Sequence, residues 1–190
     1  MPEWQAEGII LSVRPHGEGN AVIAVLTPDH GRYAGLVRGG NSARNRGVIQ
    51  PGNRVRVNWR ARLSEQLGQM RIELVQSTAA LLLESPLRLC AIASMCALLE
   101  GTLPEREPQP SLYDGSVALL DVIAMDEDNI GWLEGYVRWE LGLLAAIGYR
   151  LDLARCVASG ETVDLAYVSP KSGGAVAFHK AGIFANRMLA

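Results

Sequence analysis

Arginine is the residue type in this sequence whose number and spacing most clearly predict a chemical role. Residues 32–62 contain eight arginines and no aspartate or glutamate, although the whole chain carries a net charge of −2. A guanidinium group can donate two parallel hydrogen bonds to a phosphate. A basic segment within an acidic chain therefore predicts that one part of the protein binds a polyanion. The alternative is an ordinary solvated surface, but such surfaces usually mix charge signs and use lysine, of which the chain has only Lys171 and Lys180.

The pattern is clearest in the stretch 53–63, which reads NRVRVNWRARL. Side chains of a strand point alternately to its two faces. As a strand, this stretch would pack Val, Trp and Leu side chains into a core. The opposite face would expose Arg54, Arg56, Asn58, Arg60 and Arg62. Four guanidinium groups in a row, with no acidic residue beside them in the sequence, repel one another, and nucleic-acid phosphates would relieve that repulsion.

A glycine-containing loop at 38–46 adds further basic residues, because its glycines would let the backbone approach a phosphate chain; an ordinary hairpin loop is the alternative. Proteins that bind single strands also stack bases on aromatic rings, at about 1–3 kcal/mol per base. Tyr33 could serve if exposed, whereas Trp59 falls on the apolar face. We therefore expect phosphate contacts to dominate and sequence preference to be small. The candidate nucleic-acid-binding residues are Arg32, Tyr33, Arg38, Arg44, Arg46, Arg54, Arg56, Arg60 and Arg62.

Residues that could support catalysis or hold a cofactor form no comparable pattern. The three histidines fall in predicted turns or loops, without a serine or cysteine nucleophile beside them, and no phosphate-binding or dinucleotide-binding glycine motif is present. Cys156 and His179 are the only remaining candidates for metal ligands, fewer than the four that a structural zinc site needs. We therefore expect a protein that is not an enzyme and that needs no cofactor.

The elements that would position the arginines change character near residue 76. Before it, apolar residues alternate with period two and predict strands at 6–14, 20–27, 32–38, 53–63 and 69–75. Five short strands with one longer connection before the fourth favour a Greek-key barrel of the OB type. An SH3-like barrel would show much the same pattern, so periodicity alone leaves both open.

Helical patterns follow. Ser85 and Pro86 predict a helix start, with the helix running to about residue 103. Ser111 and Asp114 form a predicted capping box for a second helix to about 125, and acidic residues 126–128 would begin a third that ends near 147. The expected buried stripe of the third helix is Trp132, Leu133, Tyr136, Val137, Glu140, Leu141 and Leu144. Residues 151–190 read as a small irregular lobe whose last segment begins a helix without a stop signal, so we expect either a truncated chain or a short last helix.

These patterns predict an α+β protein of several domains, with a barrel at 1–77, a helical domain at 78–150 and a small lobe at 151–190. No apolar run is long enough for a membrane span and no secretory signal is visible. We therefore expect a cytoplasmic protein without a membrane partner.

Two stretches resemble the RecO family of bacterial recombination mediators. Residues 7–40, EGIILSVRPHGEGNAVIAVLTPDHGRYAGLVRGG, resemble the start of that family, with its T-x-x-x-G turn and basic R-G loop, and the segment LAYVSPKSGGAV at 165–176 resembles its later lobe. The resemblance implies an OB-fold domain, a helical domain and a zinc-ribbon-like lobe. It also implies binding of single- and double-stranded DNA, strand annealing, and, with RecR, the loading of RecA onto DNA covered by single-strand-binding protein, whose acidic C-terminal tail is contacted.

The later lobe departs from the family in one respect. Many members carry two C-x-x-C pairs there, whereas here Cys156 stands in the first position, Ser159 replaces its partner, and residues 176–179 stand where a second pair would lie. The lobe is therefore expected to be metal-free. Two other functions stay open from the residues alone, namely a protein-binding adaptor whose basic face docks an acidic partner, and an RNA-binding barrel.

Overall fold

The computed structural model of the chain describes residues 1–125 and 131–189, with the exception of the Arg44 side chain. The chain divides into two compact units, Met1–Trp139 and Glu140–Ala190, and each is described by itself. The expected domain boundaries after residues 77 and 150 stay predictions about which parts fold independently.

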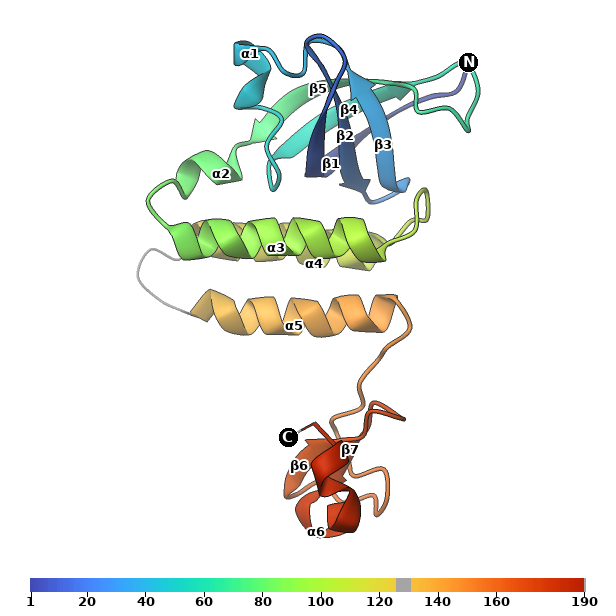
Figure 1. Cartoon of the computed structure of the whole chain (residues 1–190), viewed down its shortest axis with the longest axis vertical. Helices are drawn as coiled ribbons and strands as arrows, with labels where there is room; N and C mark the ends of the chain where they lie inside the picture. The colour runs from blue at the N-terminus through green and yellow to red at the C-terminus, as the bar shows by residue number, and fades with distance from the viewer. Residues whose placement is uncertain (126–130, 190) are drawn as a thin grey trace. The chain divides into compact units, whose positions relative to one another are not determined.

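Five strands at the N-terminus form a closed barrel in the order β1-β2-β3-β5-β4 (Figure 1). Neighbouring strands are antiparallel except for β3 and β5, which run parallel and pair at Leu36 and Gln69. This order is that of an OB-fold, so the OB interpretation is confirmed over the SH3-like one. The strands are β1 (Glu3–His16), β2 (Asn20–Thr27), β3 (Gly31–Val37), β4 (Arg54–Arg60) and β5 (Gln69–Gln76), with the short helix α1 (Ala43–Arg46) between β3 and β4.

The barrel interior is filled by the apolar face of each strand, as the period-two pattern predicts. Along β4, Val55 and Val57 are fully buried and Trp59 is 1% exposed. Trp59 stacks on Trp4 with ring centroids 5.8 Å apart, and Tyr33 meets its edge at 5.0 Å. Burial of such side chains contributes about 1.5–3 kcal/mol each. Because the interior takes every second residue of β4, the alternate arginines are held outside.

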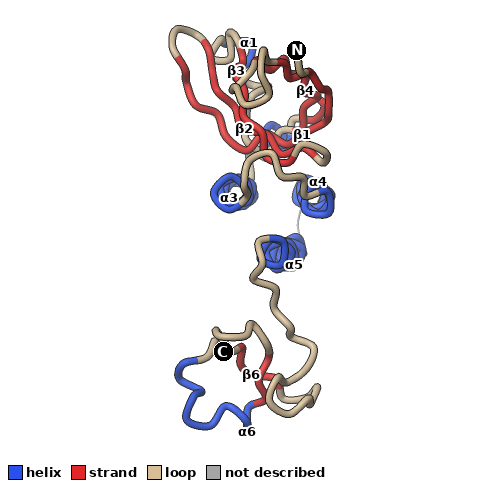
Figure 2. Tube along the Cα trace, turned by 90° about the vertical axis from the view of Figure 1, so that its right-hand side faces the viewer, coloured by secondary structure: helices blue, strands red, loops and turns tan. Residues whose placement is uncertain are grey.

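Helices α2 (Thr78–Leu81), α3 (Pro86–Thr102) and α4 (Pro110–Met125) follow the barrel, and α3 and α4 lie against one side of it (Figure 2). The buried face of α3 includes Cys96, whose thiol donates a hydrogen bond to the Ile10 carbonyl at 3.6 Å. Burial raises the pKa of Cys96 to about 12. The predicted capping box at the start of α4 is wrong. The helix begins at Pro110, whose fixed φ suits the first helical position, so Ser111 lies inside the first turn and is not the N-cap.

The third predicted helix is described as α5 (Gly131–Ala146), and its expected acidic start at 126–128 lies outside the described residues. Its expected buried stripe is partly wrong. Trp132 and Trp139 are buried, whereas Leu133 and Val137 are exposed. The Trp139 indole N–H donates to the Ser116 hydroxyl of α4 at 2.9 Å, and a buried indole needs such a partner.

The second unit contains the antiparallel pair β6 (Leu165–Val168) and β7 (Ala175–Ala177), then α6 (Phe178–Ala181) and a 3₁₀ helix at Gly182–Arg187. Cys156 is buried in its small core beside Val176, Ala177 and Ala181. The pKa of Cys156 is lowered to about 7, because the Ser159 hydroxyl and the Ala177 amide donate hydrogen bonds to its sulfur. Within the described ranges, no three His, Cys, Asp or Glu side chains gather as a metal site would require. The expectation of a metal-free lobe stays a prediction.

In the part of the chain that the structure describes, no helix has both the length and the apolar character needed to span a bilayer.

Candidate nucleic-acid interface

The outer face of β4 divides into two halves with different surroundings. In the first half, Arg54 lies 3.7 Å from carboxylate oxygens of both Glu7 and Asp121, and its guanidinium also donates to Gln76 at 3.2 Å. Arg56 lies 3.8 Å from Glu7 and 3.7 Å from Glu73. The expectation of a row of arginines without acidic neighbours is therefore wrong here.

The second half of that face contributes to a polar hollow. Strand pairing sets Asn58 opposite Arg71 of β5 and Arg60 opposite Gln69. Together with Arg38, which directly follows β3, and Asn45 of α1, these residues line a cavity of about 320 Å³. None of the described residues that line it carries a carboxylate. The other lining residues are Leu36, Val37, Met70 and Ile72.

A second hollow of about 610 Å³ adjoins the first, since both are lined by Leu36, Arg60 and Gln69. It adds Arg62 and other residues of the loop 61–68, which joins β4 to β5, namely Ala61, Gln66, Leu67 and Gly68. None of its described lining residues carries a carboxylate. We call the two hollows together the basic groove. Its cations are Arg38, Arg60, Arg62 and Arg71, all exposed, and its amides are Asn45, Asn58, Gln66 and Gln69.

Hydrogen bonds fix both walls of the basic groove. On one side the Trp59 indole donates to the Leu67 carbonyl at 3.0 Å, and the Leu36 amide donates to the Gly68 carbonyl at 3.1 Å. Gly68 has a φ of +68° and lies directly on the Trp59 ring, so a larger residue would be strained there. On the other side the side-chain amide of Asn45 donates to the Gly39 carbonyl at 2.9 Å. The groove is therefore largely preformed.

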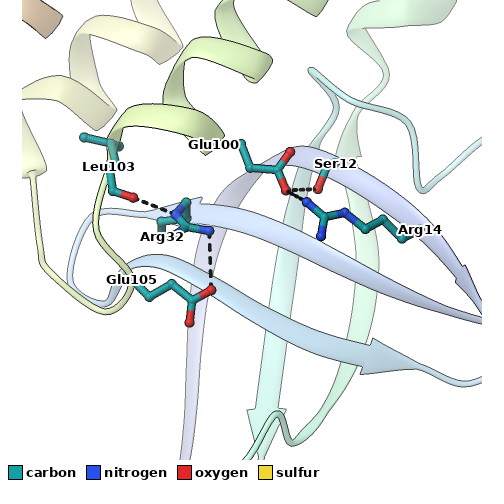
Figure 3. A network of polar contacts seen from close by, with 6 residues as sticks. All are labelled: Ser12, Arg14, Arg32, Glu100, Leu103 and Glu105. Carbon is teal, nitrogen blue, oxygen red and sulfur yellow. Dashed lines mark hydrogen bonds and ion pairs between the residues drawn. The ribbon is translucent and has the colours of Figure 1, made fainter.

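Two other sequence candidates lie outside the basic groove. The Arg32 side chain is 17% exposed; it donates to the Leu103 carbonyl at 2.9 Å and meets Glu105 at 3.4 Å (Figure 3). Tyr33 is 7% exposed and lies in the barrel core, which contradicts the expectation that it could stack on bases. The strand alternation that buries Trp59 also buries Tyr33, because both occupy inward positions.

The remaining candidates belong to the loop beside the groove. Arg46 is exposed on α1, and its Nε donates to the Asn41 carbonyl at 3.3 Å. The side chain of Arg44 lies outside the described residues. Sequence reasoning missed Arg71, although its place two residues after Gln69 in a predicted strand gives it the same outward orientation as Gln69.

Another part of the barrel surface carries arginines that are already paired. On β1, Arg14 lies 2.7 Å from the Glu100 carboxylate of α3, and the Ser12 hydroxyl donates to the same oxygen at 2.6 Å (Figure 3). Exposed ion pairs add little stability, about 0–1 kcal/mol. They do reduce what an arginine can offer to a phosphate. Among the described arginine side chains of residues 1–76, those without an ion pair are Arg46 and the four of the basic groove.

A closed five-stranded barrel of this strand order, followed by helices, defines the chain as an α+β protein with an N-terminal OB-fold. Comparison with known protein families identifies the family within this fold class. Residues 1–78 match the family model described as "Recombination protein O N terminal", and residues 83–188 match "Recombination protein O C terminal". The chain belongs to the recombination protein O family, which confirms the resemblance found in the sequence.

Curated relatives agree over nearly the whole chain. The DNA repair protein RecO of Rhodospirillum centenum is 51% identical over 190 residues, covering 99% of this chain and 74% of the relative. The DNA repair protein RecO of Rhodospirillum rubrum is 47% identical, covering 100% of this chain and 76% of the relative. That of Gluconacetobacter diazotrophicus is 43% identical, covering 98% and 74%. The chain is thus a member of a family of DNA repair and recombination proteins.

Proposed function

We propose that this chain binds single- and double-stranded DNA through the basic groove and anneals complementary strands. The observation that supports this most is the grouping of Arg38, Arg60, Arg62 and Arg71 along one concave surface without a carboxylate among its described lining residues. Guanidinium groups placed in this way can neutralise phosphates on strands that otherwise repel each other.

Annealing also requires that bases stay free to pair. Tyr33 and Trp59, the aromatic residues of the basic segment, are buried in the barrel. Contacts in the groove would therefore go to phosphates and sugars, which position a strand without reading its sequence. Watson–Crick edges would remain available to a second strand, and sequence preference would be small.

The wider role follows from the family. We expect the protein to act with RecR in loading RecA onto DNA covered by single-strand-binding protein, and to contact the acidic C-terminal tail of that protein. Such a mediator works by binding and makes no covalent bond, so we expect no enzymatic activity and no cofactor. We expect it to act in the cytoplasm, at the nucleoid. Similarity to proteins named DNA repair protein RecO, over nearly the whole of this chain and about three quarters of theirs, supports a role in DNA repair.

The test is an annealing assay with two complementary labelled oligonucleotides. We expect the full chain to accelerate duplex formation, and a variant with Arg38, Arg60, Arg62 and Arg71 all changed to Ala to lose most of that acceleration. The matched control changes Arg54 and Arg56, which are ion-paired, to Ala. Annealing at the wild-type rate by the four-residue groove variant, folded by circular dichroism, would contradict the proposal.

Two alternatives use the same guanidinium and amide groups. An acidic peptide could occupy the groove in place of DNA, and competition between labelled poly-dT and such a peptide separates these functions. Equal affinity for RNA and DNA oligonucleotides, together with no annealing, would favour an RNA-binding barrel instead.

A further inference from the structure

The connector between α3 and α4 is attached to the barrel along β3. Glu105 forms a parallel bridge with Arg32, and the backbone amide of Arg106 donates to the Arg32 carbonyl at 2.8 Å. Gly31 lies so close to the Glu107 backbone that a Cβ would not fit between them. The connector is therefore held directly against β3 and extends the barrel surface at that strand.

The Arg106 side chain extends from this connector to the loop 61–68, a wall of the basic groove. Its guanidinium carbon lies 4.9 Å from the centre of the Tyr33 ring. One guanidinium N–H donates a hydrogen bond to the Gln66 carbonyl at 3.4 Å. The cation also lies near Glu65 in the same loop. The pKa of Glu65 is lowered mainly by the Ser64 hydroxyl, and the charge of Arg106 contributes.

The other attachments of the loop are at its two ends. The Ala61 amide donates to the Pro2 carbonyl at 3.1 Å, and Trp59 and Leu36 hold Leu67 and Gly68. Between these ends, the backbone amide of Gln66 donates within the loop, to the Leu63 carbonyl at 3.3 Å. Arg106 therefore attaches the part of the loop that follows Arg62. Arg106 does not line either hollow of the groove.

We propose that Arg106 is a positioning residue for DNA binding. It holds the loop 61–68 against the barrel so that Arg62 and Gln66 face the groove before DNA arrives, and it does not touch DNA itself. This inference rests on the proposed function of the groove. A preordered loop favours binding, because ordering flexible side chains on association is unfavourable.

The backbone at Arg106 provides a sharp test. Its φ is +64°, a conformation that glycine adopts readily and other residues adopt at a cost. Arg106→Gly should therefore keep the connector path while it removes the whole side chain, including the guanidinium that bonds to Gln66. Arg106→Lys keeps a cation over Tyr33 and a donor near Gln66, so it should restore part of the function and also serves if the glycine variant folds poorly.

We would titrate the full chain with a dT oligonucleotide over a salt series and measure amide hydrogen exchange of the 61–68 peptide. We expect Arg106→Gly to bind roughly two- to tenfold more weakly, by about the cost of ordering one side chain. We also expect faster exchange in 61–68 and an unchanged slope of log K against log salt. Arg106→Lys should lie between the glycine variant and the wild type.

Wild-type affinity or wild-type exchange in Arg106→Gly would overturn the inference. A slope shallower by about 0.7 would also overturn it, because that is the change expected when one phosphate contact is lost on a single strand. Failure of the proposed function is recognised separately. If the variant lacking the four groove arginines binds DNA like the wild type, the groove is not the binding site, whatever Arg106→Gly does.

Discussion

At the scale of single residues, β4 shows that arginines on the same face of one strand can have different roles. Arg56 is shared between Glu7 and Glu73, whereas Arg60, four residues later, faces the amide of Gln69 across the strand pair. Alternation along β4 predicts which face carries the arginines. It cannot predict Glu7, Glu73 and Asp121 as partners, because these carboxylates come from other elements and reach Arg54 and Arg56 only through strand pairing and helix packing.

This difference predicts unequal effects of alanine substitution on DNA affinity. Arg60→Ala and Arg71→Ala should each weaken binding about tenfold, near 1.4 kcal/mol, because each removes a charge-assisted hydrogen bond to phosphate. Arg56→Ala, the matched control, should change affinity little, because its guanidinium already binds two carboxylates. Fluorescence anisotropy with a dT oligonucleotide measures all three, and a larger loss in Arg56→Ala than in Arg60→Ala would contradict the assignment.

The Cys156 thiol predicts a pH dependence in the small lobe. Its pKa falls from 9.0 to about 7 in the folded chain, so between these values the folded state binds fewer protons than the unfolded state. The stabilisation is therefore fully present above about pH 9 and is lost as pH falls through about 7. Ultraviolet thiolate absorbance should show a midpoint near pH 7 that Cys156→Ser abolishes. Ser159→Ala should raise the midpoint by removing the strongest hydrogen bond, and an unmoved midpoint would show that the hydroxyl is not its cause.

At the scale of elements, the five strands and the OB order agree with the sequence prediction, but several strand ends and the buried face of one helix do not. The stretch 53–63 was expected to be one strand, whereas β4 ends at Arg60. Arg62 consequently belongs to a loop, and its place in the basic groove depends on how that loop is held. The face of α5 could not be predicted either, since the hydrogen bond from Trp139 to Ser116 depends on a different helix.

Gly68 offers a test of how the loop 61–68 is held. Gly68→Ala should lower the free energy of unfolding by at least about 1–2 kcal/mol, because alanine resists the left-handed backbone and would also press on the Trp59 ring. Gly101→Ala is the matched control. It lies in α3 with open space around its Cβ position, so it should be neutral or stabilise by about 0.5–1 kcal/mol. Urea unfolding of both variants distinguishes these outcomes, and equal stability would show that the loop can adjust around Trp59.

At the scale of the whole molecule, charge is segregated although the net charge is only −2. The positions of the charged residues along the sequence predict that segregation, and the family resemblance predicts that the basic part binds DNA. Neither could show that carboxylates from α3, α4 and the connector would pair with barrel arginines, because those contacts form only when the helices pack.

The number of arginines left for DNA sets a measurable salt dependence. Four phosphate contacts predict that log K falls with log salt at a slope of about −2.8 on single strands. Titration of poly-dT from low to moderate salt measures the slope. A value near zero would exclude phosphate neutralisation as the source of affinity, and a value much steeper would mean that Arg44 or Arg46 of the neighbouring loop also binds.

The carboxylates of Glu100 and Glu105 have a consequence for the path of a bound strand. They occupy, beside Arg14 and Arg32, the places that phosphate oxygens would take if DNA crossed that side of the barrel. A strand laid there would have to displace both and would then face two negative charges without partners. Under the proposed function, the two carboxylates would therefore disfavour nucleic acid on this flank of the barrel and would direct a bound strand past β4 and β5.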